Sequence, residues 1–210
     1  MRLKWNRREL LEKCVSVGVV ISTAGLMPSA LAEAWSDTEA PKRPPTPMDE
    51  LGPFYKRQSP LGNTMRRPGD PGMPLEVDGI VYSTRGEVIP SASLEIWQTN
   101  HVGLYDLEGY SYRTNLTSNA KGEYNISSVI PGHYPARKCQ HVHYLVTAPG
   151  FRPFTTQLYF ATDPVFEGDP DKNFSKGDAA SREIVRPVTL VGDPHEIHAH
   201  VHFELVLEPL

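Results

Sequence analysis

The chain has 210 residues, of which 39% are hydrophobic and 22% are charged, and its formal net charge is −4. This length and composition suit one globular domain with a substantial buried core. The mildly acidic balance excludes the basic surface by which proteins bind nucleic acid or an anionic membrane, so a small-molecule partner is the expectation.

Residues 1–34 predict an export signal. Arg7 and Arg8 precede the apolar run "CVSVGVVISTAGLM", and "PSALAEAW" offers small-residue cleavage sites after Ala32 or Ala34. The paired arginines indicate the twin-arginine route. The alternatives are an ordinary signal peptide or an uncleaved anchor, although the run is shorter than the roughly 20 residues that span a bilayer. We expect a periplasmic or extracellular protein with no membrane span after cleavage.

Residues 35–74 are rich in proline, polar and without a hydrophobic period. Such a composition predicts an extended arm that lies over the surface of the following domain.

Residues 75–210 predict an all-β domain. Short apolar or alternating runs are separated by clusters of Gly, Pro and Asp, and no stretch of 12 residues shows a sustained helical period. This pattern favours an antiparallel β-sandwich, with a barrel as the alternative. The expected strands lie in "PLEVDGIVYS", "SASLEIW", "GEYNISSV", "QHVHYLVT", "PFTTQLYF", "REIVRPVTLV" and "HAHVHFELVLEP".

Two of these runs contain His-Val-His, where residues i and i+2 share one face of a strand. In the second run His198, His200 and His202 oppose an apolar face that begins with Ala199 and Val201. We interpret this row as a solvent-facing or edge-strand feature, because polar groups at an edge discourage association between sheets. Metal binding there would need ligands from elsewhere in the sequence.

The first run has better-placed companions. His141 and His143 are about 6.6 Å apart along a strand, which lets both imidazoles reach one ion. Tyr134 lies in the turn "PGHYP", and Tyr105 lies just beyond the strand that ends at Trp97. Either tyrosine alone is more typical of packing. Together, two phenolates and two imidazoles form a hard donor set that suits ferric iron and leaves a position for solvent or substrate.

Four segments, in order, resemble the intradiol ring-cleaving dioxygenases, the family of catechol and protocatechuate dioxygenases. They are "PLEVDGIVYSTRGEVIPSASLEIWQTNHVGLYD", "GEYNISSVIPGHYP", "QHVHYLV" and "TTQLYFATDP", and the similarity begins near Gly52 in "LGPFY". The resemblance implies that Tyr105, Tyr134, His141 and His143 bind one Fe(III) per chain. It also implies that Gln157 lies close to the iron, whereas the C-terminal histidines match no family ligand.

The chain departs from the family at one point. The family reads Arg-Pro-x-His before its first metal histidine, and here the positions read Lys138, Cys139, Gln140 and His141, with Arg137 one step earlier. Either Lys138 replaces the family arginine or Arg137 reaches the site by a local shift, and the two side chains are not interchangeable. Cys139 is interpreted as a small apolar filler.

The resemblance implies O₂-dependent opening of a catechol-type ring between its two hydroxylated carbons. The product is a muconate-type dicarboxylate, as in the catabolism of aromatic compounds. Tyr134 would take a substrate proton, and Arg137 or Lys138, together with Gln157, would stabilise anionic intermediates. Whether the chain forms a homo-oligomer is left open by the sequence. The alternatives are a metal-free, exported transthyretin-like binding module and a copper/zinc superoxide dismutase.

Overall fold

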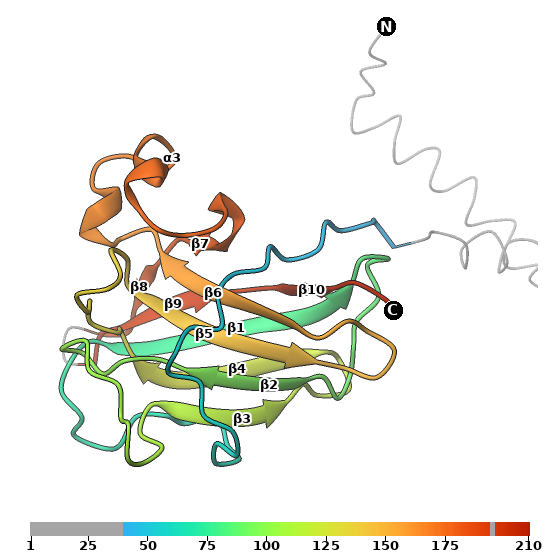
Figure 1. The fold of residues 1–210 in the computed structure, drawn as a ribbon, viewed down its shortest axis with the longest axis horizontal. Coiled ribbons are helices and arrows are strands. Elements are labelled where there is room, and N and C mark those ends of the chain that lie inside the picture. Colours follow the sequence, from blue (N-terminus) through green and yellow to red (C-terminus); the bar gives the residue numbers. More distant parts are fainter. Residues whose placement is uncertain (1–39, 194–195) are drawn as a thin grey trace, which may run out of the picture. The chain divides into compact units, whose positions relative to one another are not determined.

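The computed structural model describes residues 40–193 and 196–210, and the export signal expected at 1–34 lies outside the described residues. From Pro41 onward the chain builds two five-stranded sheets (Figure 1). One sheet has the order β10-β1-β9-β8, with β4 also paired to β1. Its strands are β1 (Pro74–Ser83), β4 (Glu123–Val129), β8 (Thr189–Val191), β9 (His198–His202) and β10 (Leu205–Leu207).

The other sheet has the order β3-β2-β5-β6-β7. Its strands are β2 (Ser93–Trp97), β3 (Arg113–Thr117), β5 (His141–Thr147), β6 (Phe154–Phe160) and β7 (Val185–Arg186). Five of the seven runs expected to form strands do so as single strands. The other two are divided: "REIVRPVTLV" begins as a 3-10 helix at Arg182–Ile184 and continues as β7 and β8 in different sheets, and "HAHVHFELVLEP" gives β9 and β10. The strand β3 was not expected, because "RTNLT" lacks apolar alternation. It forms because every one of its residues pairs with β2, so tertiary pairing overrides a weak local pattern.

The all-β class is confirmed, and the sheets are mixed rather than wholly antiparallel. β1 pairs in parallel with β9 and with β10, and β6 pairs in parallel with β7. Parallel pairing needs a long connection between the two strands, and the 24 residues between Phe160 and Val185 supply one for β6 and β7. The run 198–209 is divided at Phe203, where Tyr124 donates to the Phe203 carbonyl.

The connection between β6 and β7 carries short helices, drawn in orange in Figure 1. They are η1 (Pro164–Phe166), α3 (Pro170–Asn173), η2 (Phe174–Lys176) and η3 (Arg182–Ile184). Asp163, Asp169 and Ser181 cap three of them by accepting from backbone N–H groups. In the described part of the chain, no helix has the length and apolar character needed to cross a membrane.

The core lies between the two sheets. The Tyr144 ring on β5 packs edge-on against Tyr124 on β4 and against Phe203, with ring centroids 6.3 and 5.4 Å apart. Apolar side chains that alternate along the strands, such as Ile96, are fully buried around them. Burial of apolar surface stabilises the fold by roughly 25 cal/mol per Å². Because one face of the second sheet is used for this core, its opposite face is available for a site.

The proline-rich segment 41–73 is extended and is held to the sheets by backbone hydrogen bonds. Thr46 N–H donates to the Val206 carbonyl at 3.1 Å, and Asp49 N–H donates to the Thr155 carbonyl at 3.0 Å. The hydroxyls of Thr155 and Thr156 donate back to the carbonyls of Asp49 and Pro47. This part of the arm, blue in Figure 1, therefore lies over β6.

Candidate metal centre

The candidate site lies on the outer face of the second sheet. Trp97, His143 and Gln157 are directly opposite one another across β2, β5 and β6, and His141 is opposite Tyr159. Alternation along β5 sends Val142 and Tyr144 to the core and the two histidines to the other face. The histidines are nevertheless only 4% and 1% exposed. The arm and neighbouring loops cover them.

The structure brings the four predicted ligands together from three separate segments. The ring centroids of His141 and His143 are 4.8 Å apart, those of Tyr134 and His141 are 5.7 Å apart, and those of the two tyrosines are 5.6 Å apart. The Tyr105 hydroxyl lies 3.1 Å from His143 Nε2. The two tyrosine loops meet because residue 103 is glycine: a Cβ there would overlap the His133 carbonyl.

Both histidines are held in orientations suited to ligation. His141 Nδ1 donates to the Cys139 carbonyl at 2.8 Å, which fixes the tautomer and leaves Nε2 with a free lone pair. That Nε2 is buried and has no hydrogen-bond partner in the structure. His143 stacks on Trp97, with centroids 4.9 Å apart and planes within 2°. A buried ring nitrogen that lacks a partner is costly, and a cation held between the four side chains would satisfy it.

Burial also sets the charge of these groups. It lowers the pKa of His141 to about 4 and the pKa of His143 well below its usual value, so both imidazoles are neutral near pH 7. Burial raises the pKa of Tyr105, and Tyr134 is shifted in the same direction for the same reason. The phenols therefore stay protonated unless a strong Lewis acid binds them, and Fe(III) is such an acid.

The donor set needs its phenol oxygens. Within residues 40–193 and 196–210, no three His, Cys, Asp or Glu side chains are grouped so as to hold a metal ion. Two imidazoles alone make a weak site, whereas two imidazoles with two phenolates match the preference of ferric iron. The residues thus fit the predicted Fe(III) ion.

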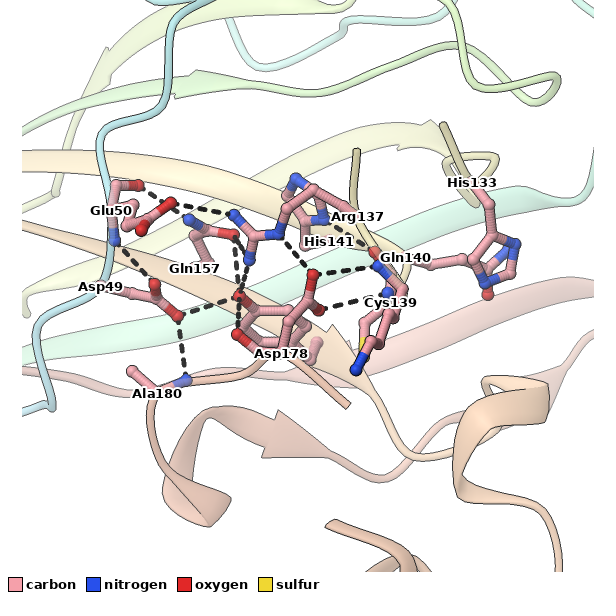
Figure 2. A network of polar contacts seen from close by, with 12 residues as sticks. Asp49, Glu50, His133, Arg137, Cys139, Gln140, His141, Gln157, Asp178 and Ala180 are labelled. Carbon is pink, nitrogen blue, oxygen red and sulfur yellow. Dashed lines mark hydrogen bonds and ion pairs between the residues drawn. The ribbon is translucent and has the colours of Figure 1, made fainter. Parts of the chain in front are cut away.

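The structure shows which of Arg137 and Lys138 has its side chain at the site. Arg137 Nε donates to Asp178 Oδ2 at 2.6 Å, and Nη2 donates to Gln157 Oε1 at 3.1 Å and to the Tyr159 hydroxyl (Figure 2). The Arg137 side chain is 11% exposed. Lys138 is exposed, and its backbone N–H donates to Asp178. Arg137 therefore reaches the face that carries His143, and Lys138 does not.

Sequence reasoning missed several residues that build the site. Asp178 accepts from Arg137 and from the N–H groups of Lys138 and Cys139. Tyr159, two residues after Gln157 on the same face, could have been found by strand alternation. Asp178 could not have been, because it lies 41 residues beyond Arg137 in a segment without a motif. Cys139 is buried and free, as expected of a filler, and burial raises the pKa of its thiol to about 12.

The C-terminal histidine row serves another contact. His200 Nε2 lies 2.6 Å from Asp78 Oδ1, and His202 Nδ1 lies 2.8 Å from Asp78 Oδ2. All three side chains are partly exposed. The row is thus partly exposed to solvent and contacts Asp78 on β1. This strand belongs to the sheet that does not carry the candidate ligands.

Gly52→Ala is expected to disturb the histidine as well as the backbone. Gly52 has φ +72°, and an added Cβ would lie 3.0 Å from His143 Cε1. The left-handed conformation costs a residue with a side chain about 1–2 kcal/mol. Gly150→Ala is the matched control, because Gly150 has φ +82° and open space around it. Urea unfolding should show a greater loss for Gly52→Ala than for Gly150→Ala, and equal losses would contradict the contact.

The metal-free protein is expected to lose stability as the pH falls from about 6.5 to about 4. Between these values the unfolded chain binds a proton on His141 that the folded chain does not, because burial lowers its pKa to about 4. The contribution is roughly 3 kcal/mol at about 1.36 kcal/mol per pKa unit. The difference between urea unfolding of the metal-free protein and of His141→Gln across this range measures it, because His143, whose pKa burial also lowers, contributes to the loss in both. An equally large loss in His141→Gln would contradict the assignment to this residue.

Comparison with known proteins now identifies relatives. A protein-family model described as dioxygenase matches residues 51–209. A hydroxyquinol 1,2-dioxygenase of Rhodococcus opacus is 30% identical, over 76% of this chain and 62% of its own length. Catechol 1,2-dioxygenase 2 of Acinetobacter lwoffii is also 30% identical, over 59% of this chain and 54% of its own. The chain thus spans between half and two thirds of the length of these curated relatives.

A solved structure gives the same result. The dioxygenase domain of a dioxygenase carbohydrate-binding protein fusion from Streptomyces sp. SirexAA-E superposes with a TM-score of 0.69 at 28% identity. The match covers 80% of this chain and all of that one. Catechol 1,2 dioxygenase of Acinetobacter radioresistens has the same TM-score at 24% identity, over 80% of this chain and 64% of that one, which shows a shared fold.

Proposed function

The chain belongs to the intradiol ring-cleavage dioxygenase family, and on that premise we propose that it opens a catechol-type ring with O₂ between the two hydroxylated carbons. The product is a muconate-type dicarboxylate. The observation that carries the proposal is the buried, unpartnered Nε2 of His141 in a cluster with His143, Tyr105 and Tyr134. A metal-free binding module would have no use for such an atom.

We propose that these four residues hold one Fe(III). When bound, the ion supplies Lewis acidity that draws electron density from the catecholate and makes the ring reactive toward O₂. The protein supplies neutral imidazoles, phenol oxygens and a face from which β5 and the arm exclude most water.

The remaining steps fall to side chains of this chain. Tyr134 lies on a turn rather than a strand, so it can move aside and take a proton from a substrate hydroxyl at its phenolate oxygen. Arg137, held against Gln157, places a fixed positive charge beside the donor set to stabilise developing negative charge. Gln157 is itself fixed, because its Nε2 donates to the Glu50 carbonyl at 2.7 Å.

We further propose that the protein is exported by a twin-arginine-type signal at residues 1–34, on the basis of Arg7 and Arg8 before the apolar run. This route carries folded proteins, which agrees with a metal acquired before export. The route can be tested with two reporter fusions, one to the chain with its signal and one to the chain without it, located by cell fractionation. Arg7→Lys and Arg8→Lys serve as controls.

Metal analysis and oxygen uptake test the function. We expect near one iron per chain, a visible phenolate-to-iron absorption, and consumption of O₂ with catechol or hydroxyquinol that yields a ring-opened diacid by mass spectrometry. Tyr134→Phe should change the colour. If Tyr134→Phe and His143→Ala both keep iron, absorption and ring cleavage, the assignment is wrong. Copper with zinc would instead point to the dismutase, and absence of any metal to a binding module.

A further inference from the structure

A cavity of about 690 Å³ opens beside Arg137, next to the proposed iron site. Its lining residues are Met48, Asp49, Glu50, Ala136, Arg137, Asp178 and Ala180. It adjoins the donor set through Arg137, which contacts Gln157, the residue opposite His143. A catechol that presents its hydroxyls to the donor set must place its other ring substituents in neighbouring space, and this cavity provides such space.

The charges around the cavity are unbalanced. Its lining contains three carboxylates, Asp49, Glu50 and Asp178, and one cation, Arg137. Glu50 is the most open of the acids, with 79% of its side chain exposed, and its Oε2 lies 3.5 Å from Arg137 Nη1. The lining therefore carries a net negative charge at neutral pH.

The single cation is already engaged. The Arg137 Nε donates to Asp178, and Nη2 donates to Gln157 and to Tyr159 (Figure 2). A guanidinium binds a carboxylate best by presenting two N–H groups along one edge. Both edges that include Nη2 are occupied by protein, and Nη1 faces Glu50. A carboxylate on the substrate would find no free paired donors and would meet the three acids.

From this geometry, and resting on the proposed function, we infer that the enzyme selects catechols without a ring carboxylate, and that Glu50 is a specificity-determining residue. The Glu50 carboxylate repels an anionic ring substituent, whereas it exerts no such repulsion on an uncharged substituent. Catechol and hydroxyquinol fit this class, and protocatechuate does not.

The test compares catechol with protocatechuate on the iron-loaded protein. Anaerobic dissociation constants are read from the visible absorption, and kcat/KM from oxygen uptake. The wild type is expected to favour catechol by about tenfold or more. Glu50→Lys, which changes the local charge by about two units, should reduce that preference by about tenfold, and Glu50→Gln, which changes it by about one, should lie between the two. Added salt should narrow the preference. Glu208→Gln, a surface acid paired with Arg152 outside the cavity lining, is the control and should leave the preference unchanged.

The outcomes separate the two hypotheses. If catechols are opened but the wild type favours protocatechuate, or the preference is the same in Glu50→Lys as in Glu208→Gln, the inference about selectivity is wrong and the proposed function stands. If the iron-loaded protein opens no catechol at all, the proposed function fails and the inference falls with it.

Discussion

Replacing His143 with alanine is expected to abolish both iron retention and ring cleavage. The ring is 1% exposed, stacks on Trp97 and presents Nε2 toward the Tyr105 hydroxyl. Loss of groups that merely orient a ligand typically costs 10- to 100-fold in metal affinity, so loss of a ligand should exceed about 100-fold. Iron per chain after gel filtration, and the visible absorption, measure the effect without reliance on turnover.

His200→Ala is the matched control, because it removes a histidine from the other His-Val-His strand. His200 contacts Asp78, on the sheet that does not carry the site. It should keep its iron and its colour. Circular dichroism of His143→Ala then shows whether the sandwich is still folded. A folded His143→Ala protein that retains iron, or a His200→Ala protein that loses it, would contradict the assignment of the two strands.

Arg137→Ala is expected to lower kcat/KM by about 10²–10³-fold, the usual cost of removing one preorganised group that stabilises developing charge. Lys138→Ala should change it by less than about twofold, because Lys138 is exposed. Arg137→Lys should recover little activity, since a compact ammonium lacks the planar, spread donors by which the guanidinium reaches Asp178, Gln157 and Tyr159. Steady-state oxygen uptake with catechol measures all three variants.

The double variant Arg137→Lys with Lys138→Arg restores the family's own spacing of arginine and histidine. If this chain uses the shifted arginine, the double variant should be as impaired as Arg137→Lys alone. Recovery of wild-type kcat/KM in the double variant, or a large loss in Lys138→Ala, would show that position 138 provides the charge. Iron content serves as the check that the ligands are undisturbed.

Much of the fold followed from local pattern. Alternation in β1 and in β5 was strong enough to place strands, and to place His141 and His143 on the face opposite Tyr144. The strand β3 was missed because its residues are polar and its stability comes from pairing with β2. The parallel pairs of β1 could not be predicted either, since period-two alternation says nothing of strand direction.

The donor set could be proposed from the sequence because its four residues, of the two types Tyr and His, lie at recognisable positions, whereas its surroundings could not. Alternation alone left Arg137 and Lys138 equivalent, and the choice depends on Asp178, which approaches from a loop 41 residues away. The placement of Glu50 was hidden for the same reason: its carbonyl accepts from Gln157, 107 residues further along the chain, and its carboxylate faces Arg137. Contacts at such separations leave no periodic trace in a sequence.

The hydrogen bonds between the arm and β6 also bear on the order in which the protein folds. Asp49 and Thr155, and Glu50 and Gln157, are joined across more than 100 residues. Closing so large a loop carries an entropy cost that hairpin pairs such as β5 and β6 avoid, so the arm is expected to dock after β5 and β6 have paired. An added Cβ at Gly52 of the arm would lie 3.0 Å from His143 Cε1, so docking of the arm is expected to shield this histidine. An ion is therefore expected to reach His143 more readily before the arm docks than after it.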